Sequence, residues 1–197
     1  MRIVDWNDFT GGGLPFAGPL ALTVGVFDGL HLGHRALIDR ILGESGALAT
    51  VVTFSQNPLR VVRPEGFAGD IFSPERKLAL LEELGVGLVV MIDFSREFAN
   101  MSGRDFIGLL LDGRPVRLVA LGSDFRCGYG LDTGAGDIAA LAAERGVETW
   151  IAPPVMDGGW PVSSSRIRIA LAAGHLAEAE RLLGRPLNYQ AGGKSPV

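Results

Sequence analysis

The sequence of 197 residues has little cysteine, no basic block and no long apolar run, and each of these absences argues against a class of protein. A single cysteine, Cys127, excludes an internal disulfide and a metal site built from several cysteines, so a role as a small packing residue is favoured. The formal net charge is −4 and no block is rich in lysine or arginine, which argues against nucleic acid as a partner. No apolar run is long enough to span a bilayer, and the first residues lack the apolar core of a signal peptide. We therefore expect a cytoplasmic chain with neither a membrane nor a nucleic-acid partner.

Hydrophobic residues make up 47% of the sequence and charged residues 20%, a balance that predicts a folded domain rather than disorder. The length suits one domain with a substantial core. No internal repeat or linker divides it, so we expect one domain over residues 1–187. The polar, glycine-rich residues 188–197 are expected to form a flexible tail.

Apolar runs alternate with helical patterns along the chain. Strands are predicted over residues 20–26, 47–54, 88–92, 116–121 and 147–152. Helices are predicted over residues 32–42, 73–85, 103–111, 134–145, 163–174 and 176–183. This alternation predicts a Rossmann-like α/β fold, a five-stranded parallel sheet with helices on both faces. Ligands then bind at the carboxyl ends of the strands.

Two of the three histidines, His31 and His34, lie at the first strand–helix turn. Their spacing places both imidazoles on one face near a helix N-terminus, where backbone N–H groups also point. Gly33 between them leaves room for a ligand atom, so the pattern predicts a phosphate-binding corner rather than two surface histidines. A zinc site is disfavoured, because only Asp28 is nearby as a further ligand. Asp28 itself could cap the turn, orient an imidazole or help to hold a metal.

Three further segments are candidate ligand loops, each with an ordinary structural alternative. Residues 163–168 place serines at a helix start with Arg168 one turn later, which is either a second anion corner or a simple cap. The glycine-bearing residues 122–130 follow a strand, where a ligand loop belongs, but such loops are common without a function. Residues 53–58 offer an aromatic ring and amides, Phe54 and Asn57 among them, which suit a planar ligand or form a simple turn.

The chain resembles the adenylyltransferase domain of bacterial bifunctional FAD synthetases, which belongs to the HxGH nucleotidyltransferase superfamily. The matching stretches are residues 25–34, 94–102 with Phe106, 122–126 and 162–168, followed by the closing Gly184-Arg185-Pro186. The HxGH element alone indicates only the superfamily, whereas these stretches in order are specific to the flavin branch. The resemblance runs from about residue 20 to residue 187.

The resemblance implies transfer of AMP from ATP to FMN, which yields FAD and pyrophosphate with Mg²⁺. By position it implies that His31 and His34 contact the ATP phosphates. No residue is assigned as a metal ligand, because the sequence does not give the ligand set. The triphosphate would be held by Ser164, Ser165 and Arg168. The resemblance also implies that Gly25, Phe27 and Asp28 line the nucleotide pocket and that Asp124 lies near the adenosine. Phe54 and Asn57 would lie on the flavin side.

The sequence departs from the family pattern in three places. It ends at Val197, before a riboflavin kinase domain, so we expect a monofunctional enzyme that takes FMN from elsewhere. Residues 55–58 replace the usual acid-Pro-His/Arg-Pro pattern, and Cys127 replaces a phenylalanine in a loop that is a few residues longer. Two alternatives therefore stay open: an adenylyltransferase with a different phosphate acceptor, and a catalytically silent flavin- or nucleotide-binding relative. The oligomeric state is not predicted.

Overall fold

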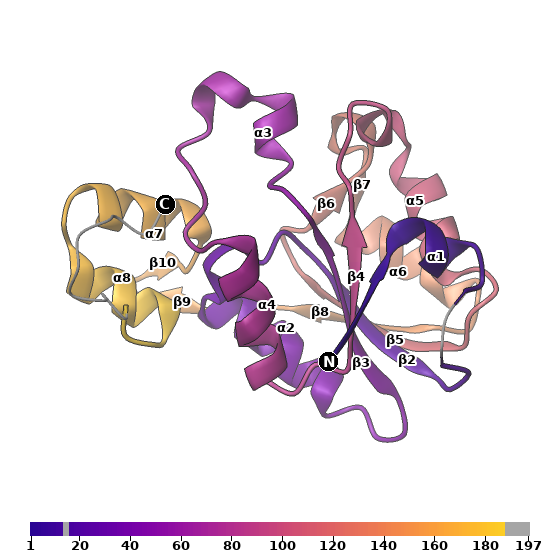
Figure 1. Cartoon of the computed structure of the whole chain (residues 1–197). Helices are drawn as coiled ribbons and strands as arrows, with labels where there is room; N and C mark the ends of the chain where they lie inside the picture. The colour runs from indigo at the N-terminus through magenta and orange to yellow at the C-terminus, as the bar shows by residue number, and fades with distance from the viewer. Residues whose placement is uncertain (14–15, 188–197) are drawn as a thin grey trace.

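The computed structural model describes residues 1–13 and 16–187, and it confirms the predicted α/β class. One parallel sheet forms the centre, with the strand order β1-β4-β3-β2-β5-β8 (Figure 1). Its strands are β1 (Arg2–Asp5), β2 (Leu20–Val24), β3 (Leu48–Phe54), β4 (Leu88–Ile92), β5 (Val116–Gly122) and β8 (Glu148–Ala152). The sheet thus has six strands instead of the five predicted, because β1 is a short, largely exposed edge strand without a long apolar run. The predicted tail at 188–197 lies outside the described residues.

Helices cover both faces of the sheet, as predicted. One face carries α2 (Leu32–Leu42) and α4 (Pro74–Glu83), and the other carries α1 (Trp6–Thr10), α5 (Gly103–Leu111) and α6 (Ala135–Ala143). The bounds of α2 and α5 agree with the prediction. Ser73 caps α4 by accepting a hydrogen bond from a backbone N–H of the first turn, which is the role that its sequence position indicates.

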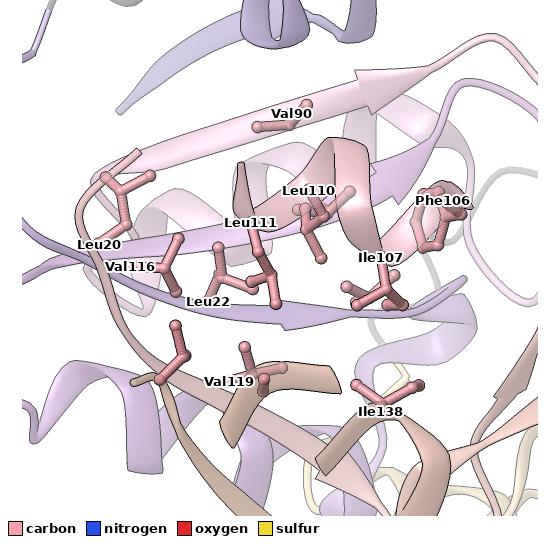
Figure 2. Close-up of a cluster of buried hydrophobic side chains, with 14 of the residues drawn as sticks. Leu20, Leu22, Val90, Phe106, Ile107, Leu110, Leu111, Val116, Val119 and Ile138 are labelled. Atoms are coloured by element: carbon pink, nitrogen blue, oxygen red, sulfur yellow. The ribbon is translucent and has the colours of Figure 1, made fainter. Parts of the chain in front are cut away.

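The strands alternate their side chains between two buried clusters. In β2, Leu20, Leu22 and Val24 face α5 and α6, whereas Ala21 faces α2. Figure 2 shows the first cluster, in which Phe106 and Leu110 of α5 lie against the sheet. Full burial of a side chain of this size stabilises the fold by about 1.5–3 kcal/mol. Packing in the two clusters therefore holds the central strands in place between the helices. It thereby fixes where the carboxyl ends of these strands lie.

A helical pair, α7 (Ser164–Ala172) and α8 (Leu176–Leu183), packs at the side of the sheet (Figure 1, orange to yellow). Ile167 and Leu182 of this pair share a third buried cluster with Ile71, which precedes α4. Arg166 ties the pair to the preceding hairpin, β9 (Met156–Asp157) and β10 (Trp160–Pro161), through the carboxylate of Asp157. The last part of the chain is thereby brought next to the segment that precedes α4.

Smaller elements lie in the connections at the carboxyl ends of the strands. They are the single turn α3 (Leu59–Val62), the hairpin β6 (Arg126–Cys127) with β7 (Thr133–Gly134), and four short 3₁₀ turns. In the part of the chain that the structure describes, no helix combines the length and the apolar character needed to cross a membrane.

The order of the strands locates the ligand site. From β2 the chain moves outward through β3 and β4, and it then crosses back to β5 and β8 on the other side of β2. The direction of winding therefore changes between β2 and β5. In open parallel sheets the ligand crevice lies at such a point, outside the carboxyl ends of the strands.

Candidate active site

The β2–α2 corner, residues 25–34, turns sharply after β2. Phe27, Gly29 and Leu30 have positive φ angles of 53°, 79° and 44°. This conformation is unfavourable for phenylalanine and leucine, so the surrounding packing must hold it. Phe27 and Leu30 are fully buried, and the N–H of Leu30 donates to the Phe27 carbonyl. Packing therefore holds the corner in one conformation up to the first residue of the histidine motif.

The two imidazoles stack against each other at the start of α2. His31 caps the helix, since its Nδ1 accepts a hydrogen bond from the backbone N–H of His34 at 3.3 Å. The ring centroids are 3.7 Å apart with an interplanar angle of 15°, and His34 lies edge-on to Phe27. A Cβ on Gly33 would lie 3.1 Å from Cε1 of His31. Glycine therefore gives room to the His31 ring itself.

Burial keeps both histidines uncharged at neutral pH. Desolvation lowers the pKa of His31 to about 4, although the carboxylate of Asp124 opposes this shift. Desolvation also lowers the pKa of His34, and His31 and Lys77 add to the effect. Nδ1 of His34 is buried without a hydrogen-bond partner among residues 1–13 and 16–187. The pair can thus offer neutral N–H and N groups to a ligand, but it does not supply a positive charge.

Asp28 joins three segments that are far apart in the sequence. Its Oδ1 accepts from the backbone N–H of Ile71 at 2.8 Å, and its Oδ2 accepts from the Arg168 guanidinium. Its main-chain carbonyl accepts from the hydroxyl of Ser164 at 2.9 Å. Arg168 also donates to the carbonyl of Gly69. Asp28 therefore fastens the β2–α2 corner to the chain before α4 and to the start of α7.

The carboxyl group of Asp28 is only 6% exposed, and desolvation raises its pKa. The Ile71 N–H and the Arg168 charge oppose that rise. The sequence left three roles open for this residue. The contacts show a further one, in which Asp28 positions a cation and a loop.

The start of α7 forms the second predicted corner. Ser163 caps the helix by accepting from the backbone N–H of Arg166, and Ser165 is exposed in the first turn. Because Ser164 and Arg168 both contact Asp28, this helix start lies directly beside the β2–α2 corner. Arg166, in contrast, bonds to Asp157 and Glu178 and serves the packing of the hairpin.

A pocket opens between the ends of β2 and β3. Its walls come from residues 26–29, from Ser55, Gln56 and Asn57, and from the approach to α4. Asn57 is buried and donates to the carboxylate of Asp70 at 3.1 Å. The predicted candidate Asn57 thus lines the pocket, while its amide is held by a neighbouring side chain.

Lys77 lines the same pocket and was not among the predicted site residues. It lies in α4, only 9% exposed, and its Nζ donates to oxygens at the ends of β2 and β3. In the sequence it stands within a charged helical stretch, Glu75-Arg76-Lys77, which indicates a solvated face. One signal could have found it: the sequence contains only two lysines, Lys77 and Lys194, beside sixteen arginines.

The other predicted residues surround this centre. Gly25 lies under the Phe27 ring, which a Cβ at that position would approach to 3.2 Å. Phe54 meets Phe94 edge-on, with ring centroids 5.6 Å apart. Asp124 is exposed after β5, close enough to His31 to influence its pKa.

Cys127 packs partly buried against the core, and desolvation raises the pKa of its thiol to about 12, which suits the predicted packing role.

A parallel sheet with a histidine pair at its β2–α2 corner defines a class, the nucleotidyltransferase-like α/β proteins. Within this class the chain belongs to the FAD synthetase family, whose model matches residues 15–166.

Curated relatives agree with this family. The bifunctional riboflavin kinase/FMN adenylyltransferase of Escherichia coli K12 is 36% identical over 172 residues, covering 84% of this chain and 54% of the relative. The corresponding protein of Bacillus subtilis is 32% identical over 173 residues, covering 84% and 53%. An FAD synthetase of Listeria monocytogenes is 27% identical over 168 residues, covering 84% and 68%. The chain thus spans about half the length of the two bifunctional relatives.

Solved structures agree with the fold. A crystal structure described as a macrolide-efflux protein from Streptococcus pneumoniae superposes with a TM-score of 0.82 at 26% identity. That match covers 95% of this chain and 63% of the other. A pantoate-β-alanine ligase from Francisella tularensis has a TM-score of 0.58 at 16% identity over 93% and 85% of the two chains, which is a likeness of fold alone.

Proposed function

We propose that the chain is an FMN adenylyltransferase, which transfers AMP from ATP to FMN and releases pyrophosphate. The observation that carries the proposal is the stacked pair His31 and His34 at the point of the sheet where the winding reverses, in the corner whose Asp28 bonds to Arg168. Membership of the FAD synthetase family supports the flavin acceptor. The reaction belongs to the domain of residues 1–187, and the setting that we propose is the cytoplasm.

The proposed chemistry needs no protein nucleophile. A phosphate oxygen of FMN attacks the α-phosphorus of ATP, a new P–O bond forms, and the bond to the leaving pyrophosphate breaks. The protein must align the two phosphates and stabilise the charge that moves to the leaving group. Neutral imidazoles suit the first task, because an N–H of His31 or His34 can bond to a phosphate oxygen without a proton being transferred.

The remaining site residues take supporting roles in this proposal. Arg168 supplies the positive charge for the triphosphate, together with the hydroxyls of Ser164 and Ser165 at the start of α7. Asp28 holds Arg168 in place, and Gly25 and Phe27 shape the wall of the nucleotide pocket. We place the adenosine beside Asp124 and the flavin beside Phe54 and Asn57.

Mg²⁺ is proposed to arrive with ATP. No group of three or more His, Cys, Asp or Glu side chains suited to a metal ion occurs in the described part of the chain. Asp28, the buried carboxylate of the corner, is already bonded to Arg168 and Ile71. A Mg²⁺ ion held mainly by phosphate oxygens fits this arrangement, and when bound it neutralises charge on the phosphates.

The direct test incubates the purified chain with ATP, Mg²⁺ and FMN, and it measures FAD and pyrophosphate. Both products in equal amounts support the proposal. FMN and ATP binding without product would identify a silent binding relative instead. Riboflavin in place of FMN, with measurement of FMN, tests separately for kinase activity.

A second candidate function, an adenylyltransferase with another phosphate acceptor, is favoured by one observation. Ser55, Gln56 and Asn57, which replace the family pattern, line the pocket directly. Pyrophosphate release with another phosphorylated acceptor, and none with FMN, would decide for this alternative.

A further inference from the structure

Lys77 is a buried cation that makes no ion pair with any residue of the described ranges 1–13 and 16–187. Its Nζ donates to the carbonyl of Phe54 at 2.9 Å, to the hydroxyl of Thr53 at 3.2 Å and to the carbonyl of Val26 at 3.4 Å. All three oxygens are uncharged groups at the carboxyl ends of β2 and β3. Lys77 therefore sets the spacing of these two strand ends and places a positive charge at the wall of the pocket.

The carboxylates near Lys77 are already paired with other cations. Asp28 bonds to Arg168, and Asp70 bonds to Arg60 at 3.0 Å. These five side chains are three cations and two carboxylates, and the histidines beside them are neutral. Arg168 and Arg60 bond to these carboxylates from outside the pocket lining, so the group of five side chains carries one net positive charge. That charge lies on Lys77, which is the one of the three cations that lines the pocket. Because an unbalanced buried charge is unfavourable, the pocket favours an anionic ligand.

The hydrogen bonds of Lys77 allow such a ligand to bind. The longest of its three bonds is the one to the Val26 carbonyl, which also accepts from the Thr53 hydroxyl at 3.1 Å. If Nζ turned one N–H toward an anion, the Val26 carbonyl would keep a donor. The rearrangement leaves no buried acceptor without a partner, so its cost is small.

The position of the pocket indicates which substrate supplies the anion. Ser55, Gln56 and Asn57 line it, whereas His31, His34 and Arg168 do not. Lys77 is nevertheless near enough to His34 to lower the pKa of that residue. A group at this place lies against residues 26–29 of the β2–α2 corner, but not against His31, His34 and Arg168, to which we assign the ATP phosphates.

We infer that this pocket is the subsite for the phosphate of the acceptor, and that Lys77 is the residue that makes it prefer a phosphorylated over an unphosphorylated acceptor. The inference deepens the proposed function and rests on it. Under that function the acceptor phosphate is the nucleophile, so a cation here selects the correct acceptor and orients its attacking oxygen.

The two lysines of the sequence make a direct experiment possible. The full chain labelled with ¹³C and ¹⁵N in lysine gives two sets of side-chain signals, which Lys194→Arg assigns. FMN is expected to shift the Lys77 signal, while riboflavin, which lacks only the phosphate, shifts it much less. Equal shifts with FMN and riboflavin, or a shift with an ATP analogue but not with FMN, would overturn the inference.

Affinity measurements provide the second arm. In Lys77→Gln, which keeps a donor but removes the charge, the preference for FMN over riboflavin should fall about 10- to 100-fold. Riboflavin affinity should stay within about threefold of its original value, because a general loss of structure would weaken both ligands alike. Arg117→Gln is the matched control, since it removes one charge from β5, where the guanidinium donates to the Ser45 carbonyl. An unchanged preference in Lys77→Gln would contradict the inference.

Failure of the inference and failure of the proposed function give different results. If the unaltered chain forms FAD while FMN leaves the Lys77 signal in place, the subsite is wrong and the function stands. If FMN shifts the signal but no FAD forms with ATP, the function is wrong and the subsite stands.

Discussion

The β2–α2 corner and the segment of residues 55–72 border the same pocket but differ in how they are held. The corner is closely packed, and its two imidazoles are neutral. The 55–72 segment instead has an ion pair at its base, Asp70 with Arg60, and exposes Leu59 and Val62 of α3 at its outer end (Figure 1). Packing therefore fixes the groups that we assign to the reacting phosphates, whereas an ion pair holds the side that we assign to the acceptor.

This difference separates two tasks. A neutral, packed corner can align phosphate oxygens without a change of protonation near pH 7. The charged 55–72 segment can select a ligand by its charge. The exposed side chains at its outer end can be substituted with little effect. Arg168 connects the two regions, since it bonds to Asp28 of the corner and to the Gly69 carbonyl of the segment.

The largest effect on stability is expected from Arg168→Ala. The substitution leaves the buried Asp28 carboxylate without its cation, and loss of one partner of such a pair costs about 3 kcal/mol. Urea unfolding measures the loss. Arg35→Ala is the control, because Arg35 forms an exposed pair with Asp39 that contributes about 0.5 kcal/mol. Equal losses in the two variants would show that Asp28 does not join the two regions.

An effect of similar size is expected from acid. The pKa of His31 is about 4 in the folded chain and 6.5 as a free side chain, so between these values the unfolded chain binds the extra proton. The free energy of unfolding should therefore fall as pH falls from 6.5 to 4, by about 3 kcal/mol for this group. Urea unfolding at pH 7 and at pH 4.5 tests this dependence.

His31→Gln sharpens the acid experiment. The variant has no imidazole at position 31, so its free energy of unfolding should depend less steeply on pH in this window. An equally steep dependence in both proteins would mean that His31 is not the group held neutral by the corner.

The smallest effect is expected at the outer end of the 55–72 segment. Val62 is 52% exposed in α3, so Val62→Ser should change the free energy of unfolding by less than about 0.5 kcal/mol. A thermal melt and an assay of FAD formation check this. A large loss of activity with an unchanged melting temperature would show that the outer end takes part in the reaction.

Much of the fold could be predicted, because each central element carries its own signal. The run of residues 88–92 is apolar throughout and bounded by turn residues, and Ser73-Pro74-Glu75 gives three agreeing signals for a helix start. The histidine corner was equally predictable, since its residues are contiguous in the chain. A motif of this kind is visible in a single sequence.

The parts that were missed depend on contacts between distant residues. β1 has little apolar character and becomes a strand only because it pairs with β4. Lys77 has the sequence surroundings of a surface residue, and only the packing of α4 against β2 and β3 buries it. The partner of Asp28 lies 140 positions away, so its role could not be deduced from the spacing around the motif.

The central claim is that the histidine pair of the β2–α2 corner serves the transfer step rather than the binding of the acceptor. The most direct test is FAD formation by His34→Ala, with FMN affinity measured on the same protein. The account predicts that kcat falls about 100-fold or more, as for loss of a group that stabilises the transition state, while FMN affinity changes less than about threefold. Comparable losses in kcat and in FMN affinity would contradict it.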